Sequence, residues 1–136
     1  MTSTPPPRAQ VEDDPEQLLD DVVPLDRRVH LELAETVLNP PTNNSTLRPV
    51  DCEQIALELA GHARVVADDV RRRCAQLGAR DPKRILTEAV LGEADRRLSV
   101  RPRPTLPSAQ NRARLLRTLY ERLDSLPPVP TASPPP

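Results

Sequence analysis

The hydrophobic pattern of this chain is clearest between residues 49 and 78. Eight apolar residues recur there at steps of three or four positions: Cys52, Ile55, Leu59, Ala63, Val66, Val70, Cys74 and Leu77. This spacing places them on one face of an α-helix, which has 3.6 residues per turn. The pattern therefore predicts an amphipathic helix that packs this face against other apolar surfaces.

Three further segments, residues 24–39, 82–98 and 108–126, carry the same pattern and each predict a helix. Their apolar faces are Leu25, Val29, Leu33 and Val37 in the first, Ile85, Leu86, Ala89, Val90, Ala94 and Leu98 in the second, and Ala109, Ala113, Leu116, Leu119, Tyr120, Leu123 and Leu126 in the third. Ahead of the first, residues 14–22 predict a short acidic helical turn. No segment alternates apolar and polar residues with a period of two, so the sequence predicts no strand.

Capping signals set the expected starts of these helices. Pro24 favours the start of a new helix, and Asp81 followed by Pro82 is typical of an N-cap and a first helical position. Asp51 and Ser108 are the expected N-caps of the other two helices, because their side-chain oxygens can accept from the first free backbone N–H groups.

Glycine is rare, with 3 in 136 residues, so the position of each one carries information. Gly78 is expected to end its helix in the left-handed conformation that glycine adopts without strain. Gly61 lies inside the same predicted helix, where it costs about 1 kcal/mol relative to alanine. Either the helix bends at Gly61 or a neighbouring backbone approaches closely there, and Gly92 is a second candidate for such an approach.

These segments together predict an all-α protein, a small up-down bundle of three or four helices. Short loops between the last three helices favour antiparallel neighbours. The bundle is expected to occupy residues 14–126, between a disordered N-terminal tail (1–13) and a disordered proline-rich tail (127–136). The helix expected to start near Asp51 and to end at Gly78 is longer than its partners, so either the first helix or a second copy of the protein is expected to cover its free end.

Composition changes the expected core. The chain has 18 prolines, no Trp or Phe, and one aromatic residue, Tyr120. Its core must then consist of Leu, Val, Ile and Ala, which bury less area per residue than aromatic side chains do. We therefore expect modest stability, or a partner chain that completes the core.

The net charge of −1 conceals a strong asymmetry along the chain. Residues 1–68 carry 5 basic and 13 acidic side chains, whereas residues 69–136 carry 14 basic and 7 acidic ones. This asymmetry favours either docking of the acidic first helix on the basic half or binding of an anionic partner. Nucleic acid is the more specific version of the second alternative, in which an anionic partner binds. Against it, acidic residues alternate with the arginines, and aromatic residues for base stacking are missing.

Cys52 and Cys74 are the only cysteines. On one helix, 22 residues span roughly 33 Å at ~1.5 Å per residue, far beyond the ~7 Å limit for a disulfide. Both are expected to be reduced and buried, as suits a cytoplasmic protein. The N-terminus has no signal-peptide pattern, and no stretch is long and apolar enough for a membrane span.

Few residues of this chain suit catalysis. The two histidines are His30 and His62. Glu58 lies one turn before His62, so these two side chains form either a pair of metal ligands or a solvent-exposed pair of neighbours on the helix. A catalytic cysteine needs a cationic or histidine neighbour to lower its pKa, and the apolar stripe directs Cys74 inward. Glycine-rich phosphate loops, nucleophile elbows and zinc-protease motifs do not occur. We therefore expect no catalytic residue, no metal and no cofactor.

The C-terminal third carries recognisable motifs. Residues 91–98 read Leu-Gly-Glu-Ala-Asp-Arg-Arg-Leu, and after a linker a helix rich in Ala and Arg runs over 111–126. These motifs resemble a family of small actinobacterial helical proteins of unknown function, loosely grouped with natural-product biosynthesis. The resemblance implies a helical fold over roughly residues 15–126 and implies no catalytic residues. Members often carry Cys and His in the last helix, where this chain has neither.

The sequence thus predicts a non-enzymatic helical protein that binds another protein or a second copy of itself, as an accessory or regulatory protein. The predicted contact surface lies on the last helix and consists of Leu115, Leu119 and Tyr120, with Arg114 and Arg117 at its rim. Tyrosine and arginine are favoured at the centres of protein interfaces. Two alternatives stay open: Leu119 and Tyr120 close the bundle core, or the arginine-rich half binds nucleic acid weakly.

Overall fold

The computed structural model describes residues 15–40 and 47–129, with side chains from residue 26 onward. These residues form four α-helices: α2 (Pro15–Leu38), α3 (Pro49–Cys74), α4 (Pro82–Leu98) and α5 (Leu106–Asp124). This part of the chain contains no strand, so the predicted all-α fold is confirmed. The predicted tail over 1–13 and most of the one over 127–136 lie outside the described residues.

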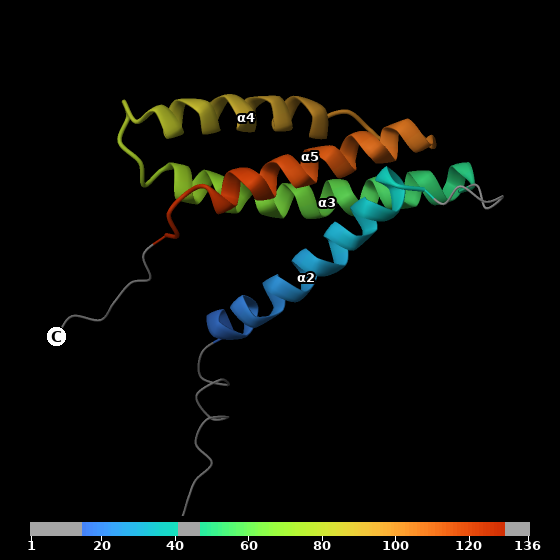
Figure 1. Ribbon diagram of the computed structural model, residues 1–136, viewed down its shortest axis with the longest axis horizontal. Coiled ribbons are helices and arrows are strands. Elements are labelled where there is room, and N and C mark those ends of the chain that lie inside the picture. The colour runs from blue at the N-terminus through green and yellow to red at the C-terminus, as the bar shows by residue number, and fades with distance from the viewer. Residues whose placement is uncertain (1–14, 41–46, 130–136) are drawn as a thin grey trace, which may run out of the picture.

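The helices pack in three layers (Figure 1). α3 and α5 lie side by side and share the most extensive contact, while α2 and α4 cover opposite sides of this central pair. Successive helices alternate in direction, as the predicted up-down arrangement requires, so α3 and α5 run parallel to each other. α2 packs mainly on α5 rather than on α3, which follows it in the sequence. The N-terminal end of α2 extends away from the other three helices.

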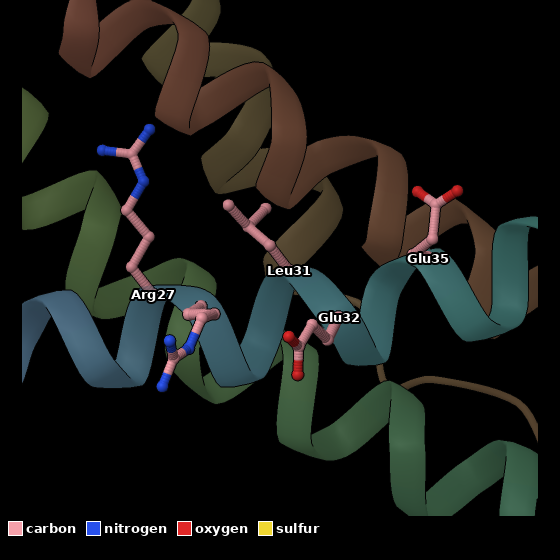
Figure 2. Close-up of a pocket in the computed structure, with 5 residues that line it drawn as sticks. Arg27, Leu31, Glu32 and Glu35 are labelled. Atoms are coloured by element: carbon pink, nitrogen blue, oxygen red, sulfur yellow. The ribbon is translucent and has the colours of Figure 1, made fainter.

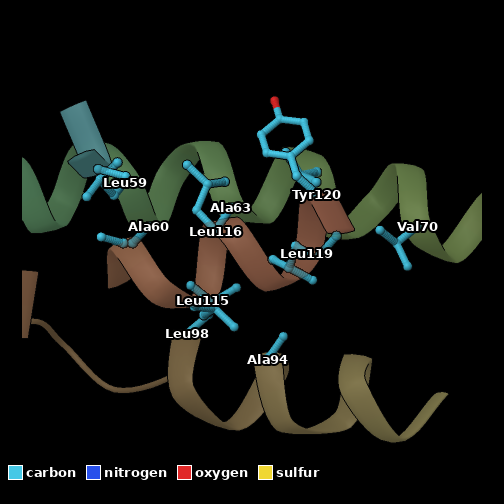
Figure 3. Packing of buried hydrophobic residues seen from close by; sticks show 14 of the residues in the cluster. Leu59, Ala60, Ala63, Val70, Ala94, Leu98, Leu115, Leu116, Leu119 and Tyr120 are labelled. Carbon is cyan, nitrogen blue, oxygen red and sulfur yellow. The ribbon is translucent and has the colours of Figure 1, made fainter. Parts of the chain in front are cut away.

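The core lies between α3 and α5 and extends to one face of α4 (Figure 3). The predicted stripe of α3 is confirmed: Cys52, Leu59, Ala63, Val66, Val70 and Cys74 are buried, and Ile55 and Leu77 are partly buried. The predicted stripe of α5 is buried throughout, from Ala109 to Leu126. Small residues such as Ala60 on α3 and Ala113 on α5 leave room for the leucines of the facing helix. The largest fully buried apolar side chains of this core are leucines and valines, as the absence of Phe and Trp from the sequence predicts.

The positions of prolines account for the differences between the predicted and the observed helix starts. α2 runs through Pro24, where the sequence predicts a new start, because a proline removes one backbone hydrogen bond and the bonds on either side still hold the helix. α3 begins at Pro49 rather than at Asp51, and α5 begins at Leu106 rather than after Ser108. In both cases a proline occupies the first turn, where its missing N–H has no helical acceptor to lose. These helices therefore start earlier than predicted.

Side chains at the starts of α4 and α5 explain these boundaries. Asp81 caps α4 as predicted, its carboxylate accepting from the backbone N–H of Lys83 at 2.9 Å. Thr105 caps α5, its hydroxyl accepting from the backbone N–H of Ser108 at 3.3 Å. The Ser108 hydroxyl accepts instead from the backbone N–H of Arg103 at 3.0 Å. Ser108 thus stabilises the connector before α5 and is not its N-cap.

Gly78 does not have the left-handed role that the sequence predicts, and neither Gly61 nor Gly92 is a close approach between helices. α3 ends at Cys74 in right-handed backbone, and no described residue has a positive φ, so Gly78 is not a left-handed helix end. The N–H of Leu77 bonds to the Cys74 carbonyl at 3.0 Å, in a turn that needs no glycine. A Cβ at Gly61 would meet no neighbouring atom within 4 Å, and one at Gly92 would meet a single side-chain atom at 3.8 Å. Neither position is a close backbone approach, because no other helix lies against it.

Candidate functional site: the outer face of α4

α4 presents an apolar face that no other helix of the described residues covers. Its buried residues are Thr87, Leu91, Ala94 and Leu98. Ile85 and Leu86 stand on the other side of the helix and are 59% and 53% exposed, and Ala89, one turn further, is also exposed. We call Ile85, Leu86 and Ala89 the α4 outer face.

The sequence predicts these three residues as part of a buried stripe, and that prediction is wrong. α4 packs mainly on α3 and contacts α5 little, so only a narrow stripe of its surface is covered. That stripe includes Thr87, a polar residue that the hydrophobic pattern passes over. Burial of the remaining exposed surface of Ile85 or Leu86 would contribute about 1–2 kcal/mol for each side chain. The α4 outer face therefore favours contact with a partner.

Basic residues surround the start of this face. Arg80 and Lys83 are exposed and form no ion pair with the described residues. Arg84 pairs with Glu88 at 3.2 Å and also donates to the Leu77 carbonyl at 2.7 Å, which ties the α3–α4 turn to α4. The free charges of Arg80 and Lys83 make this end of α4 complementary to an acidic partner.

The five residues predicted to form a contact surface on α5 lie in two different places. Leu115, Leu119 and Tyr120 are buried, with exposed fractions of 4%, 0% and 4%. Figure 3 shows them inside the bundle, with Leu115 directed towards α4 and Tyr120 towards the opposite side. Arg114 and Arg117 are exposed. Only the two arginines lie on the surface, so the alternative in which Leu119 and Tyr120 close the core is the arrangement observed.

α2, α3 and α5 bring both histidines and the tyrosine together. The rings of His30 and His62 stack, with centroids 3.9 Å apart and planes 6° from parallel. The Tyr120 hydroxyl lies 2.6 Å from His62 Nε2. Glu58, expected to pair with His62, lies instead 3.6 Å from His30 Nε2. The sequence does not reveal this cluster, because only the packing of α2 across α3 and α5 brings its members into contact.

Burial controls the protonation of this cluster. It lowers the pKa of His62, and the nearby charge of His30 lowers that pKa further. Burial also raises the pKa of Tyr120 to about 12, so the phenol keeps its proton and donates to the neutral His62 ring. Arg27 lies over the Tyr120 ring, 4.3 Å from its centroid, and donates two hydrogen bonds to Asp124 at 2.9 and 2.6 Å. The cluster thus joins α2 to α3 and α5.

An open cavity of about 360 Å³ lies beside Arg27 on the surface of α2 (Figure 2). Arg27, Leu31 and Glu35 rise from α2 towards α5, and Glu32 points away from it. All lining residues come from this one helix, and two of them are basic and two acidic. Because these charges offset one another, the cavity favours no particular class of ligand.

The described residues include no group of three or more His, Cys, Asp or Glu side chains placed to hold a metal ion. Cys52 and Cys74 are free and buried, as predicted. Burial raises the pKa of the Cys74 thiol, which disfavours the reactive thiolate. None of the described helices is long and apolar enough to cross a membrane.

Many arginines are used within the protein itself. Several donate to backbone carbonyls near helix ends: Arg64 to Leu98 at 2.8 Å, Arg73 to Leu123 at 3.0 Å, and Arg84 to Leu77 at 2.7 Å. Others pair with carboxylates, as Arg71 does with Asp95 of α4 and Arg72 with Asp69 on its own helix. The ion pairs offset part of the positive charge that the C-terminal half offers to nucleic acid.

The described residues thus define a small all-α bundle whose polar clusters join its helices and whose α4 leaves an apolar face uncovered. The chain belongs to a family of unknown function, DUF6415, whose model matches residues 30–127. The match spans α3, α4, α5 and the part of α2 from His30 onward. Neither a curated protein nor a solved structure matches the chain. The predicted family of unknown function is confirmed, and its source and its grouping with natural-product biosynthesis stay predictions.

Proposed function

We propose that this protein acts by binding protein rather than by catalysis, as an accessory or regulatory protein, and that it binds through the α4 outer face. The exposure of Ile85 and Leu86 carries the proposal. Adjacent large aliphatic side chains on a surface are typical of interaction sites, whereas scattered single ones are not. The free thiols of Cys52 and Cys74 support a reducing compartment such as the cytoplasm.

The occupant that we propose is the acidic start of α2 from a second copy of the chain. Residues 15–25 have no basic side chain and combine acidic with apolar residues: Glu16, Asp20 and Asp21 with Leu18, Leu19, Val22, Val23 and Leu25. This end of α2 extends away from its own bundle, and α2 and α4 lie on opposite sides of the α3–α5 pair (Figure 1). The contact is therefore between two chains, and its acidic helix complements the basic start of α4.

Sedimentation velocity of the full chain tests both the surface and the occupant. We expect the wild-type chain to sediment as a dimer and Leu86→Glu as a monomer, because the new carboxylate repels the acidic helix and cannot be buried without cost. Val65→Glu is the matched control: Val65 is 55% exposed but lies on α3, so this variant should stay dimeric. Asp20→Lys combined with Asp21→Lys reverses the charge of the occupant and should also give a monomer.

Each outcome has a definite meaning. A wild-type chain that stays monomeric at its highest soluble concentration contradicts the second copy as occupant. A dimer that survives Leu86→Glu contradicts the α4 outer face as the contact surface. Far-UV circular dichroism of each variant separates a lost contact from a lost fold, because the helical signal should be the same in all of them.

A further inference from the structure

A cavity at the connector between α4 and α5 is strongly basic. It has a volume of about 470 Å³ and lies at the N-terminal end of α5, where Thr105 and Ser108 line it. Its charged residues are Arg97, Arg101, Arg103 and Arg112, and none of its lining residues is acidic. An excess of one charge in a concave site concentrates ligands of the opposite charge.

Arg112 is a buried cation in this cavity. It is only 6% exposed, and it donates to the Val100 carbonyl at 2.6 Å and to the Asn111 side-chain oxygen at 3.2 Å. Its Nε–H is buried and has no acceptor within the described part of the chain, and no carboxylate there pairs with the guanidinium. Burial lowers the pKa of Arg112, and the charges of Arg64 and Arg97 lower it further. A buried charge without a countercharge is costly, so a bound anion would stabilise this site.

The other arginines differ in how far their charge is compensated. Arg97 donates to Glu93 at 2.8 Å, and Arg101 lies 4.0 Å from Glu53. Arg103 is exposed and has no carboxylate partner among the described residues. Arg103 and Arg112, before and within α5, therefore supply most of the excess charge. The positive end of the α5 helix dipole adds to it.

We propose that this cavity binds the phosphate group of a small phosphorylated organic molecule. The planar guanidinium groups of arginine match the oxygens of a phosphate. Val100 is 61% exposed and lines the same cavity, so it offers an apolar surface to the organic part of the ligand. This site lies at the C-terminal end of α4, whereas the α4 outer face lies near the start of that helix. A ligand bound here therefore leaves the proposed dimer contact free.

Isothermal titration calorimetry with inorganic phosphate and with phenyl phosphate tests this proposal. Both should bind the wild-type chain, phenyl phosphate more tightly because its ring covers Val100, and Val100→Ser should abolish that preference. Arg103→Gln should weaken both by about tenfold, as expected for the loss of one charge-assisted hydrogen bond. The matched control is Arg117→Gln, which removes an exposed arginine of α5 outside the cavity and should change either affinity by less than about twofold.

NMR gives a readout at the buried arginine itself. The Nε–H resonance of Arg112 should shift when phenyl phosphate is added to the wild-type chain, since the anion brings a countercharge next to it. Binding of neither probe, or equal weakening by Arg103→Gln and Arg117→Gln, overturns the proposal. A DNA duplex that binds more tightly than phenyl phosphate, with affinity falling steeply as salt rises, overturns it as well, because the site is then part of a nucleic-acid surface.

Discussion

The contact between α2 and the rest of the bundle combines the buried Ala34 and Val37 with a few polar side chains. His62 is half-buried, stacks on His30 and accepts a hydrogen bond from Tyr120, whose ring lies under Arg27. The sequence singled out His30 and His62 as the two histidines and Tyr120 as the one aromatic residue, and it did not single out Arg27. Its hydrophobic periodicity gives the face of each helix, but it gives no information on which distant side chains meet across helices, and so the cluster could not be predicted.

Thermal stability should depend on pH through His62. In the folded state the pKa of His62 lies below its ordinary value. In acid the unfolded chain therefore takes up a proton on His62 more readily than the folded chain does. The stability gained from a neutral His62 is fully present above the unfolded pKa, about 6.5. It is lost progressively as the pH falls from there through the lower folded pKa. We therefore expect the Tm to fall between about pH 7 and pH 5, measured by circular dichroism.

His62→Gln is the control for this dependence on pH. The groups that face His62 are His30 and Asp26 on α2, Glu58 on its own helix, and Tyr120 on α5. The charges of Asp26 and Glu58 raise the pKa of His62 and so oppose the effect of burial in part. The variant removes the imidazole and should have a smaller loss of Tm over the same pH range. An equal loss in both chains would assign the dependence to another group.

At the scale of whole helices, periodicity predicted a buried face correctly only where a helix has close neighbours along its length. The stripes of α3 and α5 are buried as predicted because these two helices pack along each other. The predicted stripe of α4 is wrong at Ile85, Leu86 and Ala89, because none of the described helices packs against that side of α4. A sequence pattern does not say how many helices surround a given one. The α4 residues that were wrongly predicted to be buried are therefore the residues of the candidate interaction surface.

Gly61→Ala should stabilise the protein. The position is helical and exposed, and an added methyl group would meet no neighbouring atom within 4 Å. Alanine restricts the unfolded chain more than glycine does, so the free energy of unfolding should rise by about 0.5–1 kcal/mol. Urea denaturation measures this change, and Gly92→Ala on α4 should behave similarly. A loss of stability at Gly61 would mean that another backbone packs there, which is one of the two alternatives that the sequence left open.

At the scale of the molecule, the charge asymmetry predicted either docking of the acidic first helix on the basic half or binding of an anionic partner. α2 does pack on α5, which belongs to that half. The ion pair that joins them, however, has its base, Arg27, on α2 and its acid, Asp124, on α5. Net charge summed over half a chain therefore did not identify the groups in contact. Packing of aliphatic side chains holds the helices together, and individual polar contacts between helices add to it, such as the ion pair of Arg27 with Asp124 and the hydrogen bond from Arg73 to the Leu123 carbonyl.

Arg73 should therefore contribute more to stability than its neighbour Arg72. Arg73 is partly buried and donates from α3 to the Leu123 carbonyl at 3.0 Å, which holds the C-terminal end of α5. Arg72 is exposed and pairs with Asp69 on its own helix. A hydrogen bond from a charged group contributes about 1.5–3 kcal/mol, whereas an exposed ion pair contributes about 0.2–1 kcal/mol.

Urea denaturation of Arg73→Gln and Arg72→Gln compares these two contributions under the same loss of charge. The free energy of unfolding should fall by about 1.5 kcal/mol or more in Arg73→Gln and by less than about 1 kcal/mol in Arg72→Gln. The slope of the free energy of unfolding against urea concentration should be the same in both variants, because neither changes the surface area exposed on unfolding. Equal losses of stability in the two variants would mean that the hydrogen bond from Arg73 to the Leu123 carbonyl contributes no more than the exposed ion pair of Arg72. Packing of the buried Leu123 and Leu126 alone would then hold the end of α5.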